Sequence, residues 1–202
     1  MTLLAVVSAS RGMSTWLEAG SVITGAVCVW LTVRESPLNF PIGMVNVATF
    51  SVVFFNAKLY GDAGLQLVYF VLAVLGWYHW LYGGTKHTAL HVARCNIMEC
   101  CASIAAGVVL TLGLWAGLHH LGGSASFWDA LTTGFSLVSQ WLLNRKRLES
   151  WLGWIFVDIV YVPLYLYKGL HLTAVLYAIF LVMAVMGYFQ WRKSWLRQAG
   201  AT

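Results

Sequence analysis

Seven apolar segments separated by short polar connections constrain this chain more than any other feature of its sequence. Each segment falls within the range of about 17–25 residues that an α-helix needs to cross a bilayer, several of them near the lower limit. No part of the chain outside these segments resembles a soluble domain. The segments run approximately over residues 14–33, 39–57, 62–83, 98–119, 125–143, 151–167 and 171–191.

The composition excludes a soluble fold. Of the 202 residues, 60% are hydrophobic and 9% are charged, whereas a soluble domain normally carries about 25% charged residues. A chain of this size cannot hide so much apolar surface from water, so its solvent must be lipid. We therefore expect an all-α integral membrane protein, with residues 1–202 forming a single membrane domain.

The basic residues predict how the chain is oriented. They lie at the ends of the apolar segments and form no single patch, so the net charge of +5 does not indicate a nucleic acid partner. Three of them fall on the N-terminal side of the membrane and nine on the other, which the positive-inside rule makes cytoplasmic. We expect the N-terminus outside and the C-terminus inside. The three are Arg11, Lys58 and Lys168; the nine are Arg34, Lys86, Arg94, Arg145, Lys146, Arg147, Arg192, Lys193 and Arg197.

An internal repeat relates the third and seventh segments. The stretches LQLVYFVLAVLGWYHW (65–80) and LYAIFLVMAVMGYFQW (176–191) align without a gap, and they share Gly76/Gly187 and Trp80/Trp191. This alignment predicts two parallel three-helix repeats, residues 14–83 and 125–191, with residues 98–119 as the helix that inverts the chain between them. Transporters with such repeats bind substrate near the membrane midplane where the repeats meet.

One acidic residue, Asp158, lies in the middle of an apolar and aromatic segment. An aspartate at the centre of a membrane helix costs about 2.5–3.5 kcal/mol, so it should face the interior of the bundle. The spacing of Trp154, Asp158, Tyr161 and Tyr165 places them along one helical face. A carboxylate one turn from an indole suits an aromatic cation. The alternative is a buried structural aspartate, either neutral or paired with arginine.

Amide and phenol side chains at similar depth extend this candidate site into both repeats. Asn46 is close to the repeat position of Asp158, and Gln66 begins the third segment opposite Tyr177 in the repeat. Gln140 lies four residues before Asn144 in the fifth segment. Hydrogen bonds between helices are the commoner fate of such groups, but their convergence favours a substrate pathway.

The sequence offers no support for an enzyme. It contains no nucleotide-binding motif and no hydrolytic group of Ser, His and Asp at a common depth. His87, His91 and Cys95 have a spacing that would align them on a helix, but the stretch has the character of a loop. We expect no metal site and no cofactor.

Several stretches together resemble the PnuC family of vitamin transporters over nearly the whole chain. The resemblance rests on WLEAGSVITG (16–25), NFPIGMVN (39–46), KLYGDAGLQ through GWYHW (58–80), FWDALTTGFSLVSQWLLNRKRLESWLGW (127–154) and YKGLHLTAVLY (167–177). It implies a SWEET-like arrangement of three, one and three helices in a bacterial inner membrane. The Trp-x-x-x-Asn motif of the family is met at Trp154, but Asp158 occupies its Asn position.

The family resemblance also implies a function. Such proteins take up nicotinamide riboside by facilitated diffusion for NAD salvage, and a cytoplasmic riboside kinase traps the product; a homo-oligomer is possible. Thiamine, which also carries a cationic ring, is the alternative substrate, and a membrane sensor or assembly subunit without transport is the alternative from another class. The expected substrate contacts are Asn46, Gln66, Gln140, Trp154, Asp158 and Tyr177.

Overall fold

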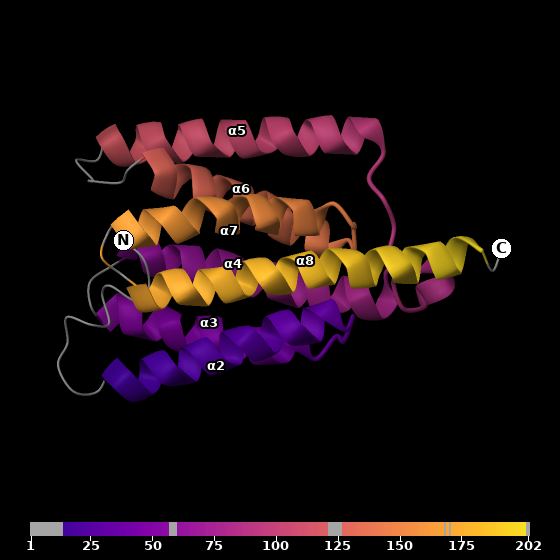
Figure 1. Ribbon diagram of the computed structural model, residues 1–202, viewed down its shortest axis with the longest axis horizontal. Helices are drawn as coiled ribbons and strands as arrows, with labels where there is room; N and C mark the ends of the chain where they lie inside the picture. Colours follow the sequence, from indigo (N-terminus) through magenta and orange to yellow (C-terminus); the bar gives the residue numbers. More distant parts are fainter. Residues whose placement is uncertain (1–13, 57–59, 121–126, 168, 170, 201–202) are drawn as a thin grey trace.

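The computed structural model describes residues 14–56, 60–120, 127–167, 169 and 171–200, and long α-helices dominate it (Figure 1). A short 3-10 helix, η1 (Thr85–His87), lies in the connection between α4 and α5. The α-helices are α2 (Ser14–Val33), α3 (Asn39–Asn56), α4 (Tyr60–Tyr82), α5 (Ile97–His120), α6 (Phe127–Asn144), α7 (Ser150–Tyr167) and α8 (His171–Ala199).

The helix boundaries follow the predicted segments within a few residues, with one exception. Helix α8 is longer than the last apolar segment, which ends at residue 191, because the helix continues to Ala199. An apolar segment ends where charges begin, at Arg192, but the backbone hydrogen bonds of a helix do not depend on apolar side chains. The stretch containing His87 and His91 is a loop apart from η1, as predicted.

Six of the helices form a closed ring. In the order α2, α3, α4, α6, α7, α8, each helix packs against the next, and α8 closes the ring on α2. Helix α5 lies outside this ring and packs mainly against α6, at the edge of the bundle in Figure 1. Helices α2, α4, α6 and α8 run in one direction, and α3, α5 and α7 run in the other (Figure 1).

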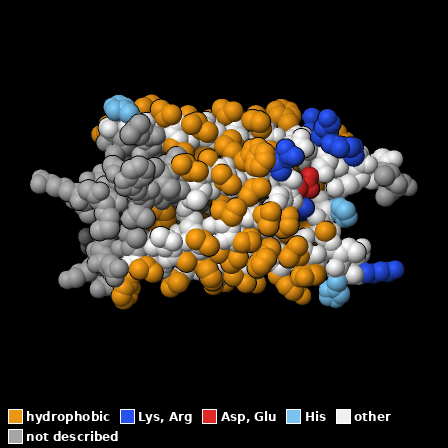
Figure 2. All heavy atoms as spheres, turned by 90° about the horizontal axis from the view of Figure 1, so that it is seen from below, with side chains coloured by type: hydrophobic (Ala, Val, Ile, Leu, Met, Phe, Trp, Pro, Cys, Tyr) orange, Lys and Arg blue, Asp and Glu red, His pale blue; other side chains and the backbone are white. Residues whose placement is uncertain are grey.

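The surface of the bundle is suited to lipid. Figure 2 shows a broad belt of hydrophobic side chains, with Lys and Arg gathered at the end of the bundle where α2, α4 and α6 finish. We call this the basic end; its cations include Arg34, Arg94 and Arg145 to Arg147. Arg11, Lys58 and Lys168, which the charge argument placed at the opposite end, lie outside the described residues.

Four stretches in the described part of the chain are long and apolar enough to span a membrane: Ala63–Tyr82, Ile97–Gly117, Ser150–Tyr167 and Thr173–Gln198. Helix α6 is more polar, because small polar side chains such as Thr132, Ser136 and Ser139 are buried against its three neighbours. A helix enclosed by other helices needs less apolar surface than one that faces lipid.

The two indoles that the sequence repeat aligned make matching contacts at the basic end. The Trp80 indole N–H donates a hydrogen bond to the Leu143 carbonyl at 3.0 Å. The Trp191 indole N–H donates to the Thr32 carbonyl, also at 3.0 Å. The two donors, Trp80 and Trp191, are 111 residues apart, and so are the two acceptors, Thr32 and Leu143. Helix α4 therefore meets α6 in the way that α8 meets α2.

Matching aromatic pairs lie beside these indoles. Phe40 packs edge-on against Trp80 with ring centroids 5.1 Å apart, and Trp151 packs edge-on against Trp191 at 5.3 Å. All four side chains belong to the buried apolar core. This cluster joins the ring of helices at the basic end.

Candidate substrate-binding cavity

A cavity of about 340 Å³ lies within the ring of six helices. This volume is in the range of about 300–1,000 Å³ that is usual for small-molecule sites. Every helix of the ring contributes to the wall, and α5 contributes none of the lining residues in the described part of the chain. The polar residues of the wall are Thr32, Asn39, Asn46, Tyr69, Gln140, Asp158 and Tyr177.

The structure brings most of the predicted substrate contacts to this one cavity. The predicted residues in its wall are Asn46, Gln140, Trp154, Asp158 and Tyr177. Gln66 is buried on α4 but does not line the cavity. It lies three residues, about one turn, before Tyr69, which does line it, so the wall begins one turn further along α4 than the sequence predicted.

Asp158 is a buried carboxylate in the wall of the cavity, with 4% of its surface exposed. Trp154 lines the same wall one turn earlier on α7, and Tyr177 reaches the cavity from α8. The ion pairs found among the described residues use other acids, and none of them involves Asp158. A buried charge is stable only with a compensating partner, so Asp158 is either protonated in the empty cavity or paired with a bound cation.

Two amides are held in place by hydrogen bonds through their nitrogen atoms. The Asn46 amide donates to Thr24 Oγ1 at 2.7 Å, which ties α3 to α2. The Gln140 amide donates to Asn144 Oδ1 at 2.9 Å, and Asn144 in turn donates to the Leu72 carbonyl of α4 at 2.7 Å. These bonds orient two side chains of the wall without using the amide oxygens as acceptors, which suits them to receive hydrogen bonds from a ligand.

Aromatic side chains lie beyond Asp158 on the side away from the basic end. Tyr161 stacks on Tyr165 with centroids 5.2 Å apart and an interplanar angle of 14°. Tyr177 approaches both rings, at 4.6 Å from Tyr161 and 5.0 Å from Tyr165. With the tryptophan cluster at the basic end, these rings place Asp158 between two aromatic layers.

Sequence reasoning missed a polar group where α2 meets α3. The Asn39 amide donates to Thr32 Oγ1 at 2.8 Å, and the Thr32 hydroxyl donates to the Cys28 carbonyl at 2.8 Å. All three residues line the cavity. Thr32 and Asn39 lie at the ends of apolar segments, where polar residues normally face the membrane surface, so the sequence carried no signal that they point inward.

The chain is similar to known transporters along nearly its whole length. The profile of the family described as nicotinamide mononucleotide transporter matches residues 15–193. The nicotinamide riboside transporter PnuC of Escherichia coli K12 is 27% identical over 89% of this chain and 86% of its own length. The riboflavin/roseoflavin transporter RibM of Streptomyces davaonensis is 29% identical over 90% of this chain and 85% of its own.

A solved structure agrees with the fold. The crystal structure of the vitamin B3 transporter PnuC superimposes with a TM-score of 0.73 and 28% identity, covering 96% of this chain and 88% of that one. A ring of membrane helices around a cavity with polar side chains in its wall, together with these relatives, defines a helical membrane transporter and not an enzyme. The chain belongs to the nicotinamide mononucleotide transporter family, which confirms the resemblance found in the sequence.

Proposed function

We propose that this protein takes up nicotinamide riboside, whose pyridinium ring binds in the cavity beside Asp158 and Trp154. The observation that carries the proposal is a buried carboxylate in the cavity wall, one turn from an indole, with no Lys or Arg paired to it in the described part of the chain. Charge attraction and stacking then act on the same ring. Relatives along nearly the whole chain are named for nicotinamide riboside.

The polar remainder of the cavity suits the ribose and the carboxamide. The amide oxygens of Asn46 and Gln140 can accept hydrogen bonds from hydroxyl or amide N–H groups, and Tyr177 can both donate and accept. These three residues with Trp154 and Asp158 are the proposed contacts. Gln66 stays a predicted contact that the cavity in this conformation does not include.

The proposed architecture is two parallel three-helix repeats, residues 14–83 and 125–191, joined by the inverting helix at 98–119. Matching contacts of Trp80 and Trp191, one between α4 and α6 and the other between α8 and α2, support this division. So does the position of α5 outside the ring, where it adds nothing to the cavity wall among the described residues. A cavity between two repeats can open to either side of the membrane as the repeats rock against each other.

The transport mode we propose is facilitated diffusion, with phosphorylation by a cytoplasmic riboside kinase trapping the product for NAD salvage. Ion coupling usually needs further intramembrane ionisable groups near the site, and Asp158 is the one acidic residue in the described wall of the cavity. The energy for accumulation must then come from the trapping reaction.

Purified protein in liposomes tests the substrate and the mode together. We expect nicotinamide riboside to bind in a titration and to exchange across the membrane at least as fast in counterflow as in net uptake. Thiamine and riboflavin serve as competitors, and tighter binding of either one would replace nicotinamide riboside as the substrate. Binding without flux would indicate a sensor, and concentrative uptake into empty liposomes under a proton or sodium gradient would contradict facilitated diffusion.

The proposed orientation places the basic end in the cytoplasm of a bacterium, with the protein in its inner membrane. A reporter fused after Thr202 should then be active in the cytoplasm, and one inserted in HLGGSAS (120–126) should be accessible from outside. The insertion site lies largely outside the described residues, and uptake by both fusions is the control for correct folding. The reverse pattern would show that the charge argument assigned the two sides wrongly.

A further inference from the structure

The turns that end α2 and α6 share an unusual backbone conformation. Glu35 and Lys146 lie in the left-handed region, with φ of 55° and 49°. In both turns the N–H of the following residue donates to the carbonyl five residues earlier, at 2.9 Å. Glycine is the usual residue at this position because it has no Cβ to clash. Two charged residues at positions that favour glycine suggest that their side chains are needed.

Those two side chains pair with each other across the ring. Lys146 Nζ lies 3.4 Å from Glu35 Oε2. The residues are 111 positions apart, the same offset that relates Trp80 to Trp191, so each is the counterpart of the other. The side chains are 8% and 21% exposed for Lys146 and Glu35. Burial lowers the pKa of Lys146, and the nearby Glu35 carboxylate opposes this shift.

The ion pair lies beside the other contacts that join the two halves at the basic end. The Lys146 ammonium lies over the Trp80 ring, 4.6 Å from its centroid. Trp80 and Trp191 donate their hydrogen bonds to the ends of α6 and α2, the helices that Lys146 and Glu35 terminate. Leu143 and Thr32, whose carbonyls accept these bonds, both line the cavity, so the ion pair lies next to the basic end of the cavity.

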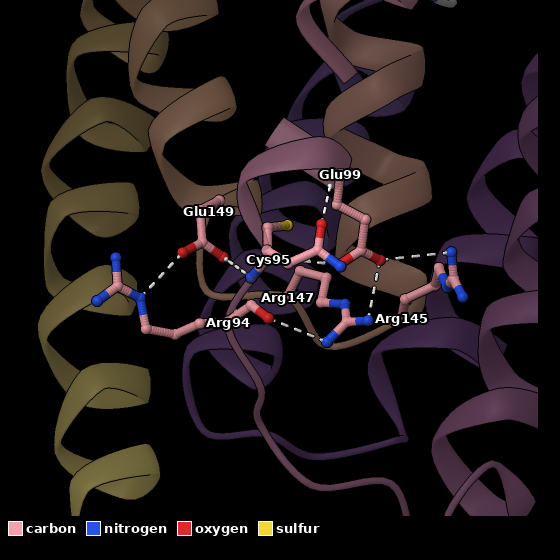
Figure 3. A network of polar contacts seen from close by, with 7 residues as sticks. Arg94, Cys95, Glu99, Arg145, Arg147 and Glu149 are labelled. Carbon is pink, nitrogen blue, oxygen red and sulfur yellow. Dashed lines mark hydrogen bonds and ion pairs between the residues drawn. The ribbon is translucent and has the colours of Figure 1, made fainter. Parts of the chain in front are cut away.

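The two sides of the ion pair are held differently. The α6–α7 turn is bonded to the α4–α5 connection, with the Ala93 N–H donating to the Lys146 carbonyl at 3.1 Å. The polar network in Figure 3 reinforces this attachment: Arg94 pairs with Glu149 at 3.1 Å, and Arg147 pairs with Glu99 at 2.9 Å. Among the described residues, the backbone bonds of the α2–α3 turn are all local, and none of them joins it to a connection between other helices.

We propose that Glu35 and Lys146 form the gate at the basic end of the cavity, with Lys146 on the anchored side and Glu35 on the side that moves. The pair holds this end closed in the conformation described here and separates when substrate passes. The proposal rests on the proposed transport cycle, in which the cavity opens to one side at a time. It does not depend on which vitamin is carried.

A cysteine already present in the cavity wall reports on this gate. Cys28 lines the cavity from α2, one turn before Thr32. With Cys95, Cys100 and Cys101 replaced by alanine, Cys28 is the single thiol of the chain. A membrane-impermeant methanethiosulfonate reagent, added to the basic side of sealed vesicles without substrate, then measures how often that end opens.

Breaking the pair should accelerate this labelling. We expect Glu35→Gln and Lys146→Gln each to raise the rate about fivefold, the effect of losing one moderately shielded ion pair. The double exchange E35K/K146E restores a pair between equivalent positions and should return the rate toward that of the parent. Arg34→Gln is the matched control. It removes a charge next to Glu35 in the sequence, but the Arg34 guanidinium lies over the Trp30 ring and takes no part in the ion pair, so the labelling rate should not change.

Glycine at both positions separates gating from folding. E35G/K146G relieves the left-handed backbone and should raise the melting temperature, while it removes the ion pair and should still accelerate labelling. A purely structural pair would give the opposite result, a lower melting temperature with labelling unchanged.

Unaltered labelling in both single variants, or no recovery in the double exchange, would overturn the gate. A wrong substrate assignment would appear in the titration and leave these labelling rates as predicted, so the two failures are distinguishable.

Discussion

Replacing Asp158 with Asn should remove most of the preference of this transporter for a cationic ring. The substitution keeps the shape of a side chain that is 4% exposed and lines the cavity, but it removes the negative charge. A hydrogen-bonded or desolvated contact with a charged group is worth about 1.5–3 kcal/mol, so the dissociation constant of thiamine should rise about tenfold or more. The dissociation constant of nicotinamide riboside should rise less, because Asn is the residue of the family motif at this position. The measurement is a binding titration on purified protein.

Two ligands of nearly the same shape, one with a cationic ring and one with a neutral ring, isolate the contribution of the Asp158 charge to binding. Dihydronicotinamide riboside has nearly the same outline as nicotinamide riboside but a neutral ring. The native protein should bind the cation more tightly, and the Asp158→Asn variant should bind the two forms almost equally. Trp154→Ala should weaken both forms, because an apolar ring contact does not depend on the charge.

Thermal stability provides the control for Asp158. If the residue only serves the packing of α7, Asn should shift the melting temperature of the empty protein and leave both affinities unchanged. That outcome would remove Asp158 from the substrate site. A changed affinity at an unchanged melting temperature would place its charge in contact with the ligand.

A large loss of stability is expected from Gly187→Ala. A Cβ atom at Gly187 would lie 2.5 Å from Cζ2 of Trp151, closer than van der Waals contact allows. Trp151 is 2% exposed and packs edge-on against the fully buried Trp191, so its ring has little room to shift. Overpacking of a core costs about 1–3 kcal/mol, and at about 2–4 °C per kcal/mol the melting temperature should fall by about 2–12 °C.

Gly113→Ala is the matched control on α5. A Cβ atom there would meet nothing within 4 Å, and alanine favours a helix over glycine by about 0.5–1 kcal/mol. The melting temperature should therefore stay the same or rise. A Gly187→Ala variant as stable as this control would mean that α8 does not approach Trp151 as closely as described.

Asp158 shows how far the sequence could define the site. A charge inside an apolar segment must face the bundle interior wherever its helix packs, so its direction followed from solvation alone. Trp154 followed from the helical period, because residues four apart share a face. Neither inference needed to know which helices are neighbours.

Gln66 shows where that reasoning stops. It lies on the same face of α4 as Tyr69, yet only Tyr69 reaches the cavity wall. The period of a helix sets which residues share a face, but the depth at which neighbouring helices leave a space depends on how the whole ring packs. Thr32 and Asn39 were missed for a related reason, since the turn between α2 and α3 directs them inward.

The sequence by itself determined the solvent, the positions of the helices and one carboxylate that faces the interior, because hydropathy and helical period act on each segment separately. Only the tertiary structure decided which helices form the ring, which places α5 outside the cavity, and which charges meet. Lys146 counted in the sequence only as one of the basic residues that set the topology, and Glu35 was not singled out; they become a pair 3.4 Å apart only when the left-handed turns that end α2 and α6 face each other. Contacts between distant segments arise from packing, which no local pattern encodes.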